Sequence, residues 1–372
     1  MSRHNKLNMK NVGIALIFLL PNLLGFICFT AYPVVLSLFM SFTNWSLKKS
    51  VEFEFVGMRN YMDLVSSREF WFYLYNTLYF MIGIPFSIIG SLLLANLLVD
   101  RMMMKSKKRK FILFITVLAL GAISTLFFAL GGKKDTALIL ALVYAAAAAG
   151  IMFGSMSFRT MLYIPSFASG ISTMILWKEI FNPYHGLFNN IISNLNSIFH
   201  LNIDAPTWLA STQNLLGFLP LPEWLNSGGF GLGAREAIII MGVWMAIGGN
   251  NMILYIASIS NIPDSMYEAA DIDGAGSLAK FWYITIPSVA PTTFFISIMS
   301  VIGGLQGGFA QARIMTNGGP AGTTTTLGYH IYTKGFEELD FGYASAIAWI
   351  MFIMIFVLTI INWKYGNRKM EA

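Results

Sequence analysis

Residues 260–291 read SNIPDSMYEAADIDGAGSLAKFWYITIPSVAP, a polar and charged segment that separates two long apolar runs. Its first half predicts a short helix over residues 264–273, DSMYEAADID. Pro263 suits the first turn of that helix, where its missing N–H is not needed for an intrahelical bond. Asp264 and Glu268 place negative charge in the early turns, where the helix dipole favours it.

The second half of this segment predicts a turn and another helix. Gly274 is a natural end for the first helix, because glycine readily adopts the left-handed conformation found there. Ser277 can cap a second helix, which leads through Phe281 into the next apolar run. The segment therefore predicts helix, glycine turn and helix. A rigid projection of this kind is suited to docking in a partner's groove and to passing on its motion.

The composition indicates an integral membrane protein. Of 372 residues, 56% are hydrophobic and only 11% are charged, whereas soluble domains carry about 25% charged residues. A helix needs about 20 apolar residues to cross the hydrocarbon core of a bilayer, and several stretches here meet that length. The one cysteine, Cys28, lies in an apolar run, which excludes a disulfide within the chain and a cysteine metal site.

Eight membrane spans are predicted, which makes the fold an all-α polytopic helix bundle. They cover residues 12–38, 74–99, 111–130, 136–156, 158–177, 237–259, 287–309 and 343–363. Basic residues precede the first run, as in a signal peptide, but the run continues past Phe42 and has no clear small-residue cleavage site. An uncleaved first span is therefore expected.

The Lys and Arg pattern predicts the orientation, because cytoplasmic loops are enriched in these residues. With an even number of spans, one side holds both termini, 14 of the 24 basic residues and six of the 18 acidic ones, a net +8. The other side holds the remaining 10 basic and 12 acidic residues, a net −2. The basic side, with the 260–286 loop, is predicted to face the cytoplasm. The net charge of +6 is thus a topology signal rather than a sign of nucleic-acid binding.

The third and fourth predicted spans form a hairpin joined by the short loop GGKKD. Removing it would leave the orientation of every other span unchanged, so it is interpreted as an insertion into a six-span core. The predicted organisation is an N-terminal part with two spans (1–100), a basic segment with the inserted hairpin (101–157) and a core domain (158–372). A lipid-facing hairpin without a transport role is the favoured reading, and small residues in its second half permit close helix packing.

Several features exclude catalysis by the chain itself. No G-x-x-x-x-G-K-[ST] phosphate loop is present, and the nearest string, DGAGSLAK, lacks both the spacing and the hydroxyl residue. No cofactor is therefore expected, and any ATP is used by partner subunits. The four histidines are expected in the tail or outer loops by chance, with neither a metal site nor a catalytic group: His4, His185, His200 and His330.

The interiors of the predicted spans contain no Asp, Glu, Lys, Arg or His. Proton-coupled carriers usually need such groups as relays, so an external energy source is the easier explanation. An uncharged substrate is also favoured, because an ionic one would want a counter-charge. A sugar, bound by hydroxyl-to-amide hydrogen bonds and aromatic stacking, fits both points.

Polar residues in two predicted spans are candidates for a substrate path. Asn250 and Asn251 lie near the middle of the sixth span, where unpaired amides are costly. Ser297, Ser300 and Gln306 follow the seventh span, with space left by glycine pairs at 303–304 and 307–308. These side chains either line the path or make interhelical hydrogen bonds, which are common in membrane bundles.

The 260–286 loop resembles the signature of permease subunits of ATP-binding-cassette (ABC) importers. That signature is Glu-Ala-Ala, three residues, Gly, nine residues, Ile, one residue, Leu and Pro. Matches at this spacing are Glu268, Ala269, Ala270, Gly274, Ile284 and Pro287, while Ile286 replaces the usual Leu. Other stretches are similar to the carbohydrate (maltose or multiple-sugar) branch: FVGMRNYMDL, NTLYF, MLYIPSF, FNPYHGLFN, TNGGPAGTTTTL and ELDFGYASAIAW. The resemblance covers most of the chain outside residues 101–157.

This resemblance implies a type I ABC importer fold in the cell membrane and a set of partners. They are two ATPase subunits, a second related permease, an extracytoplasmic solute-binding protein that docks on the outer loops (182–235 and 310–342), and a sugar. Contact with the ATPases would involve Tyr267, Glu268, Ala269, Ala270, Asp273, Gly274 and Pro287. A phosphorylated polyol such as glycerol phosphate is the alternative substrate, and a secondary carrier or a membrane enzyme is the alternative class.

Overall fold

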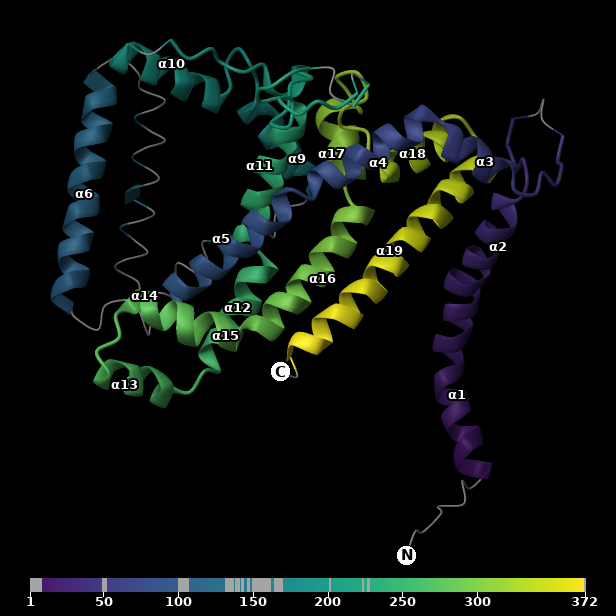
Figure 1. Ribbon diagram of the computed structural model, residues 1–372, viewed down its shortest axis with the longest axis horizontal. Helices are drawn as coiled ribbons and strands as arrows, with labels where there is room; N and C mark the ends of the chain where they lie inside the picture. The colour runs from purple at the N-terminus through teal and green to yellow at the C-terminus, as the bar shows by residue number, and fades with distance from the viewer. Residues whose placement is uncertain are drawn as a thin grey trace, which may run out of the picture.

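The computed structural model describes residues 9–48, 52–99, 107–130, 162–163, 170–200, 202–222, 224–225 and 228–370, together with Ala137, Ala141, Tyr144, Ala145 and Ala148. In this part of the chain the elements are helices, and β pairing is limited to isolated bridges. The predicted all-α class is confirmed (Figure 1).

The first half of the described chain contains two long interrupted helices and a separate one. The elements are α1 (Met9–Phe26), η1 (Ile27–Ala31), α2 (Tyr32–Ser41), α3 (Arg59–Ser66), α4 (Arg68–Phe80), α5 (Gly83–Leu98) and α6 (Lys107–Leu130). In Figure 1, α6 stands apart from the central helices, at the far side from α1 and α2.

The second half supplies the centre of the bundle and the segments at its two ends. The elements are α9 (Gly170–Ile180), α10 (Leu187–Phe199), η2 (Trp208–Ala210), α11 (Ala234–Ile247), α12 (Asn250–Ser260), α13 (Asp264–Ile272), α14 (Ser277–Lys280), η3 (Phe281–Thr285), α15 (Ile286–Ser288), α16 (Ala290–Gln306), α17 (Phe309–Gln311), η4 (Ala312–Thr316), α18 (Leu327–Tyr332), η5 (Thr333–Glu337) and α19 (Phe341–Met370).

The long apolar helices identify a multi-pass membrane protein. Four stretches are long and apolar enough to cross a bilayer: Ile17–Ser41, Arg68–Leu98, Ala234–Ser260 and Phe341–Asn362. A fifth, the bent pair Ser277–Ser288 and Ala290–Gln306, also qualifies. These match the first, second, sixth, eighth and seventh predicted spans, and α6 overlaps the third. Most of the fourth and fifth predicted spans lies outside the described residues, so the count of eight stays a prediction.

The spans are interrupted where sequence patterns alone suggested continuous helices. The π-helical turn η1 precedes Pro33, and η3 precedes Pro287. Proline has no N–H to donate and crowds the preceding turn, which explains irregular backbone at both places. The seventh span is bent by 65° between α15 and α16. The predicted start of this span at residue 287 therefore falls just before a bend rather than inside a straight helix.

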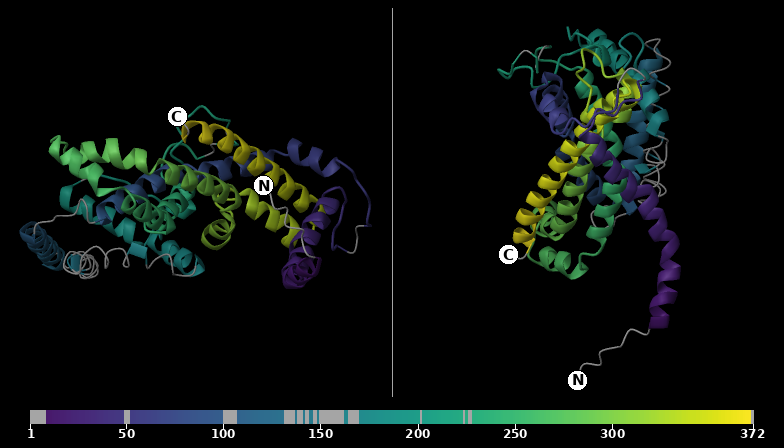
Figure 2. Two further views of the ribbon diagram at one scale, coloured as in Figure 1. Left: turned by 90° about the horizontal axis from the view of Figure 1, so that it is seen from below. Right: turned by 90° about the vertical axis from the view of Figure 1, so that its right-hand side faces the viewer.

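The central helices pack closely through small residues. Helix α5 lies against α11 and α12, and α16 lies between α5 and α19, as the views in Figure 2 show. A Cβ at Gly90 would lie 2.6 Å from the side chain of Ile247, and one at Gly83 would lie 3.1 Å from Ile239. These two glycines therefore let α5 approach α11, as small residues do in membrane bundles.

The bundle has two ends that differ in construction. Helix α13, the start of α1 and the end of α19 lie at one end, called here the α13 end. Helices α10, α17 and α18 lie at the opposite end, called here the α10 end (Figure 1). The shared end for α13 and both terminal helices agrees with the sidedness predicted from the even number of spans.

A buried arginine organises the α10 end. Arg235, in the first turn of α11, is 1% exposed. Its Nε and Nη2 donate to Asn76 Oδ1 (3.1 and 2.7 Å), and Nε also donates to the carbonyl of Thr323 (3.1 Å). Asn76 Nδ2 in turn donates to the carbonyls of Gly322 and Thr325 (2.9 and 3.0 Å). This network joins α4, α11 and the 317–326 loop.

Aromatic rings and a neighbouring carboxylate complete this cluster. The Arg235 guanidinium lies 5.2–5.7 Å from the ring centres of Phe72, Tyr75 and Tyr79, a distance at which cation–π attraction is substantial. Glu236 accepts hydrogen bonds from the Tyr79 hydroxyl and from the N–H groups of Leu215 and Gly233. The expectation that spans lack ionisable groups is thus wrong here, because α11 begins three residues before the predicted start and carries this pair.

His330 is also placed differently from the expectation of an incidental loop residue. It lies in α18, is 3% exposed, and its ring packs against those of Tyr73 and Tyr343. Burial lowers the pKa of His330 to about 4, and the nearby Lys334 adds to this effect. The imidazole is therefore neutral at physiological pH and acts as a packing group between α4, α18 and α19.

We predict that Arg235→Met destabilises the protein by about 3 kcal/mol, since it leaves the Asn76 and Thr323 oxygens unpaired in a buried site. Thermal melting in detergent, followed by tryptophan fluorescence, should show a drop of several degrees. Arg59→Met is the matched control, because Arg59 pairs with Asp63 on the surface with 73% of its side chain exposed, and such pairs contribute little. Equal melting temperatures for the two variants would contradict the role assigned to Arg235.

Candidate functional site

The 260–291 segment forms the predicted helix, turn and helix. Helix α13 spans Asp264–Ile272 and is followed by Asp273 and by Gly274, whose φ of +75° favours glycine. Two details of the prediction are wrong. Pro263 lies just before the helix in an extended conformation, and α14 begins at Ser277 itself, after Gly276 at the capping position, without a side-chain cap.

Two side-chain links close this segment on itself. The hydroxyls of Tyr267 in α13 and Thr285 in η3 lie 2.9 Å apart in a hydrogen bond. The Lys280 ammonium in α14 forms an ion pair with the Asp271 carboxylate in α13. These two contacts therefore connect α13 to α14 and to the π-helical turn η3.

The outward surface of this segment is unusually apolar for an exposed loop. Met266, Ile272 and Leu278 are 45%, 88% and 72% exposed. Glu268 is also exposed, and its carboxylate makes no hydrogen bond or ion pair with the described residues. Exposed apolar side chains beside a free charge are typical of a protein-interaction surface. Of the other residues in the predicted ATPase contact, Ala269, Asp273 and Pro287 are exposed and Ala270 is half-buried.

The segment is anchored to the membrane-spanning helices by a buried cluster. Val289 at the bend is fully buried and belongs to a cluster with Tyr255, Ile259 and Leu98, and Tyr267 packs against it. Helix α12 is bound to α16 by hydrogen bonds from the Tyr255 hydroxyl to Thr293 (3.1 Å) and from Thr292 to Ser258 (3.0 Å). A displacement of the segment would therefore reach both helices.

The candidate path residues lie at a break in the sixth span. Gly248 and Gly249 separate α11 from α12, and Asn250 begins α12. A Cβ at Gly248 would lie 2.3 Å from the carbonyl oxygen of Leu162, so another segment crosses at this point. The next residue, Tyr163, donates its hydroxyl to Asn250 Oδ1 (2.9 Å). Asn250 is exposed and Asn251 is half-buried.

The hydrogen bonds between α12 and α16 also set their antiparallel register. Since Tyr255 pairs with Thr293 and Ser258 with Thr292, Asn250 lies level with Ile298–Ser300 on α16, given equal rise per residue in both helices. Ser297 donates to the Thr293 carbonyl (2.7 Å) and is half-buried, as is Ser300. Gln306 is exposed at the last position of α16, toward the α10 end.

The glycine pairs of the seventh span serve different purposes. Gly303 faces open space, whereas a Cβ at Gly304 would lie 3.1 Å from Met81, beside the break between α4 and α5. Gly308 has a φ of +87° and turns the chain into α17. The expectation that these pairs leave space therefore holds for Gly303 and not for Gly304, which is a packing position.

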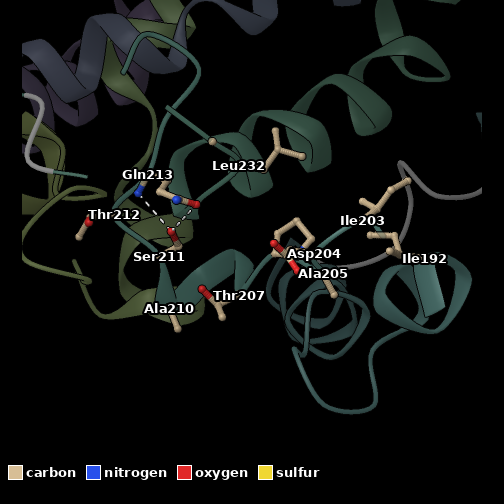
Figure 3. A pocket seen from close by; sticks show the side chains of 12 residues that line it. Ile192, Ile203, Asp204, Ala205, Thr207, Ala210, Ser211, Thr212, Gln213 and Leu232 are labelled. Atoms are coloured by element: carbon tan, nitrogen blue, oxygen red, sulfur yellow. Dashed lines mark hydrogen bonds between the residues drawn. The ribbon is translucent and has the colours of Figure 1, made fainter. Parts of the chain in front are cut away.

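A cavity with both polar and apolar walls lies at the α10 end. It has a volume of about 740 Å³ and opens between α10, the 203–213 segment and the start of α11. Figure 3 shows polar side chains along one part of the wall and Ile192, Ile203 and Leu232 along another. The polar residues are Asp204, Thr207, Ser211, Thr212 and Gln213.

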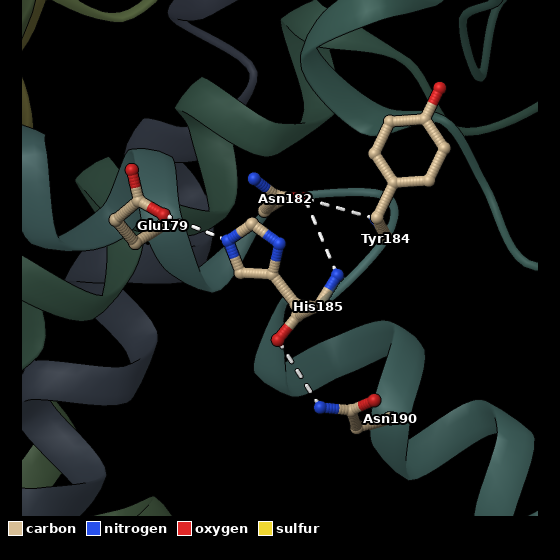
Figure 4. Close-up of polar contacts among 5 residues, drawn as sticks. All are labelled: Glu179, Asn182, Tyr184, His185 and Asn190. Carbon is tan, nitrogen blue, oxygen red and sulfur yellow. Dashed lines mark hydrogen bonds and ion pairs between the residues drawn. The ribbon is translucent and has the colours of Figure 1, made fainter.

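The turn between α9 and α10 is held by short-range polar contacts (Figure 4). Asn182 Oδ1 accepts from the N–H groups of Tyr184 and His185 (3.0 and 3.4 Å). The His185 ring lies 3.2 Å from a Glu179 oxygen, and Asn190 donates to the His185 carbonyl (3.2 Å). The Tyr184 ring is 91% exposed. Across the residues that the structure describes, no three His, Cys, Asp or Glu side chains gather as a metal site.

Sequence reasoning missed Thr285, Tyr163 and the Asn76–Arg235 pair. Thr285 is the single unspecified residue between Ile284 and Ile286 in the signature, where no identity is required. Tyr163 and Asn76 lie in stretches noted for resemblance, but their partners are 87 and 159 residues away. No local pattern reports such contacts.

Residues 111–365 match the family described as "binding-protein-dependent transport system inner membrane component". A probable ABC transporter permease protein, YesP of Bacillus subtilis (strain 168), is 27% identical over 355 residues, covering 94% of this chain and 89% of the relative. The sn-glycerol-3-phosphate transport system permease protein UgpA of Shigella flexneri is 28% identical over 234 residues, covering 63% and 70%.

Two solved structures have the same fold. One is a bacterial ABC transporter involved in the import of the acidic polysaccharide alginate, with a TM-score of 0.63 and 20% identity over 97% of each chain. The other is the alginate transporter in complex with an alginate pentasaccharide-bound periplasmic protein, with the same score and coverage of 97% and 96%. Since the family match covers more than half of the sequence, this chain belongs to the family of inner-membrane components of binding-protein-dependent ABC transport systems.

Proposed function

We propose that this chain is a permease subunit of an ATP-driven, binding-protein-dependent carbohydrate importer, that it forms half of the translocation path, and that it couples to ATPase subunits through residues 260–286. The observation that carries the proposal is the α13 segment. It is a closed, exposed projection at the end of the bundle shared by both terminal helices, anchored to α12 and α16.

The surface of this projection supports docking on an ATPase. Ile272 and Leu278 offer apolar area, and Glu268 offers an unpaired charge that can set the orientation of a partner. In this proposal ATP is hydrolysed by two partner ATPases, and this chain contributes no catalytic group and needs no cofactor. The α13 end faces the cytoplasm, with both termini.

A neutral sugar is the proposed substrate. The described residues level with Asn250 on α12 and α16 carry amide and hydroxyl groups and no charge, whereas the charged Arg235 and Glu236 lie buried near the α10 end. Similarity to a glycerol-phosphate permease and to an alginate transporter supports polyhydroxylated substrates in general. A phosphorylated polyol is the second candidate, on the strength of the UgpA similarity.

The remaining partners are a second, related permease and an extracytoplasmic solute-binding protein. The family description and the alginate complex with its periplasmic protein support the latter. We place its docking face at the α10 end, where the cavity lined in part by Asp204, Thr207 and Gln213 opens. The hairpin predicted over residues 101–157 has no assigned contact and remains a proposed lipid-facing insertion.

We predict that Gly274→Val uncouples ATP hydrolysis from sugar uptake. A side chain at φ +75° costs about 1–2 kcal/mol and would distort the turn between α13 and α14. Gly276→Ser is the matched control, because Gly276 lies in the same exposed turn at φ −70° and serine suits the position before a helix. Uptake and ATPase activity are measured together in proteoliposomes that contain the assembled complex and its binding protein.

The same assay tests the charge of the loop. Glu268→Lys should lower sugar uptake at least tenfold while the protein remains in the membrane. Glu52→Lys, the same change at an exposed position outside the outer loops 182–235 and 310–342, should not. Normal coupling in both Gly274→Val and Glu268→Lys would contradict the assignment of the loop.

We predict that Asn250→Ala raises the KM for sugar uptake more than Tyr163→Phe does, because both changes remove the hydrogen bond between these residues but only the first removes the amide. The expected difference is about three- to tenfold, the loss of one hydrogen bond to a neutral group. Equal KM values for the two variants would show that Asn250 serves only to hold Tyr163.

A further inference from the structure

We infer that the hydrogen-bonded pair Tyr267–Thr285 positions the α13 segment and transmits its displacement to the membrane-spanning helices. This inference rests on the proposed function of the 260–286 loop as the ATPase contact. It assigns a mechanical role to two residues, neither of which is a specified position of the signature.

Helices α13 and α14 lie on the surface of the bundle. Neither α13 nor α14 contains a buried residue, so burial of apolar area contributes little to their position. The ion pair between Lys280 and Asp271 joins a lysine side chain that is 14% exposed to a carboxylate that is 67% exposed, and the solvent around the carboxylate weakens the pair. The backbone connection runs through an exposed glycine turn at Gly274.

Tyr267 provides a specific link between α13 and the bundle. Its ring packs against the buried cluster around Val289 and Tyr255. Its hydroxyl meets the Thr285 hydroxyl at 2.9 Å, and Thr285 is completely buried. A hydrogen bond to a buried hydroxyl is sensitive to distance and angle, so it fixes α13 in one orientation relative to η3.

Thr285 lies where a displacement would have the largest effect. It ends the π-helical turn η3, four residues before Val289, the residue at the 65° bend between α15 and α16. Val289 N–H donates to the Thr285 carbonyl (3.0 Å). A force on α13 therefore acts through Tyr267 and Thr285 on α15, the helix that precedes the bend. The hydrogen bond between Tyr255 and Thr293 transmits it from α16 to α12.

The test uses the assembled complex in proteoliposomes, with uptake and ATP hydrolysis measured in the same sample. Tyr267→Phe removes one oxygen and keeps the ring. We expect about a three- to tenfold loss in sugar moved per ATP hydrolysed, with ATP hydrolysis itself retained and less dependent on the loaded binding protein. Thr285→Val should give the same loss, the double variant no further loss, and Thr285→Ser, which keeps the hydroxyl, should restore coupling.

Tyr32→Phe is the control, since it removes the same atom from a ring in α2 that is 63% exposed and lies outside residues 260–286, and its coupling should equal that of the unmodified chain. Normal coupling in Tyr267→Phe would overturn the inference. So would a parallel loss of uptake and hydrolysis with a lowered melting temperature, which indicates only structural support. If the Tyr267→Phe result overturns the inference but Gly274→Val still uncouples uptake from hydrolysis, the proposed function stands without the Tyr267–Thr285 pair. If Gly274→Val also leaves coupling normal, the proposed function is contradicted as well.

Discussion

The hydrocarbon core of a bilayer offers no partner to backbone N–H and C=O groups, so each interruption of a span must be covered by protein. The breaks in this chain follow that constraint. At the break between α11 and α12, Ser91 donates to the Ala246 carbonyl (3.2 Å) and the Leu162 carbonyl lies against Gly248. At the start of α5, Ser87 donates to the Gly83 carbonyl (3.0 Å). The break between α11 and α12 also places a polar group, the exposed Asn250, beside the Tyr163 hydroxyl.

The two ends of the bundle differ in how firmly their segments are held. At the α10 end, Arg235, Asn76 and Glu236 are almost completely buried and tie distant segments into one body. At the α13 end, two short helices without buried residues are held by few side-chain contacts. A tightly connected α10 end and a sparsely attached projection at the α13 end suit a subunit that receives force from a partner on one side. In this account the bend at Val289 is where that force enters the spans.

The sequence was most informative where one residue type is required by local backbone geometry. Gly274 ends α13 at a positive φ, and the apolar runs gave the long spans within a few residues. It was less informative where a contact joins distant segments. Arg235 was counted among the charges of the outer loops. It is buried instead, with a hydrogen bond to the side-chain amide of Asn76, 159 residues away, and with aromatic rings around its guanidinium. The Gly248–Gly249 break was read as continuous helix, because nothing local shows that the Leu162 carbonyl approaches there.

The contact between the α13 segment and an ATPase is the central claim, and site-specific photocrosslinking tests it most directly. A photoreactive phenylalanine at position 272, where the native side chain is 88% exposed, would be compared with one at position 184, which is 91% exposed at the opposite end. The account predicts that position 272 captures an ATP-hydrolysing subunit in native membranes and that position 184 does not. An active, membrane-inserted chain that captures no ATPase from position 272 would contradict it.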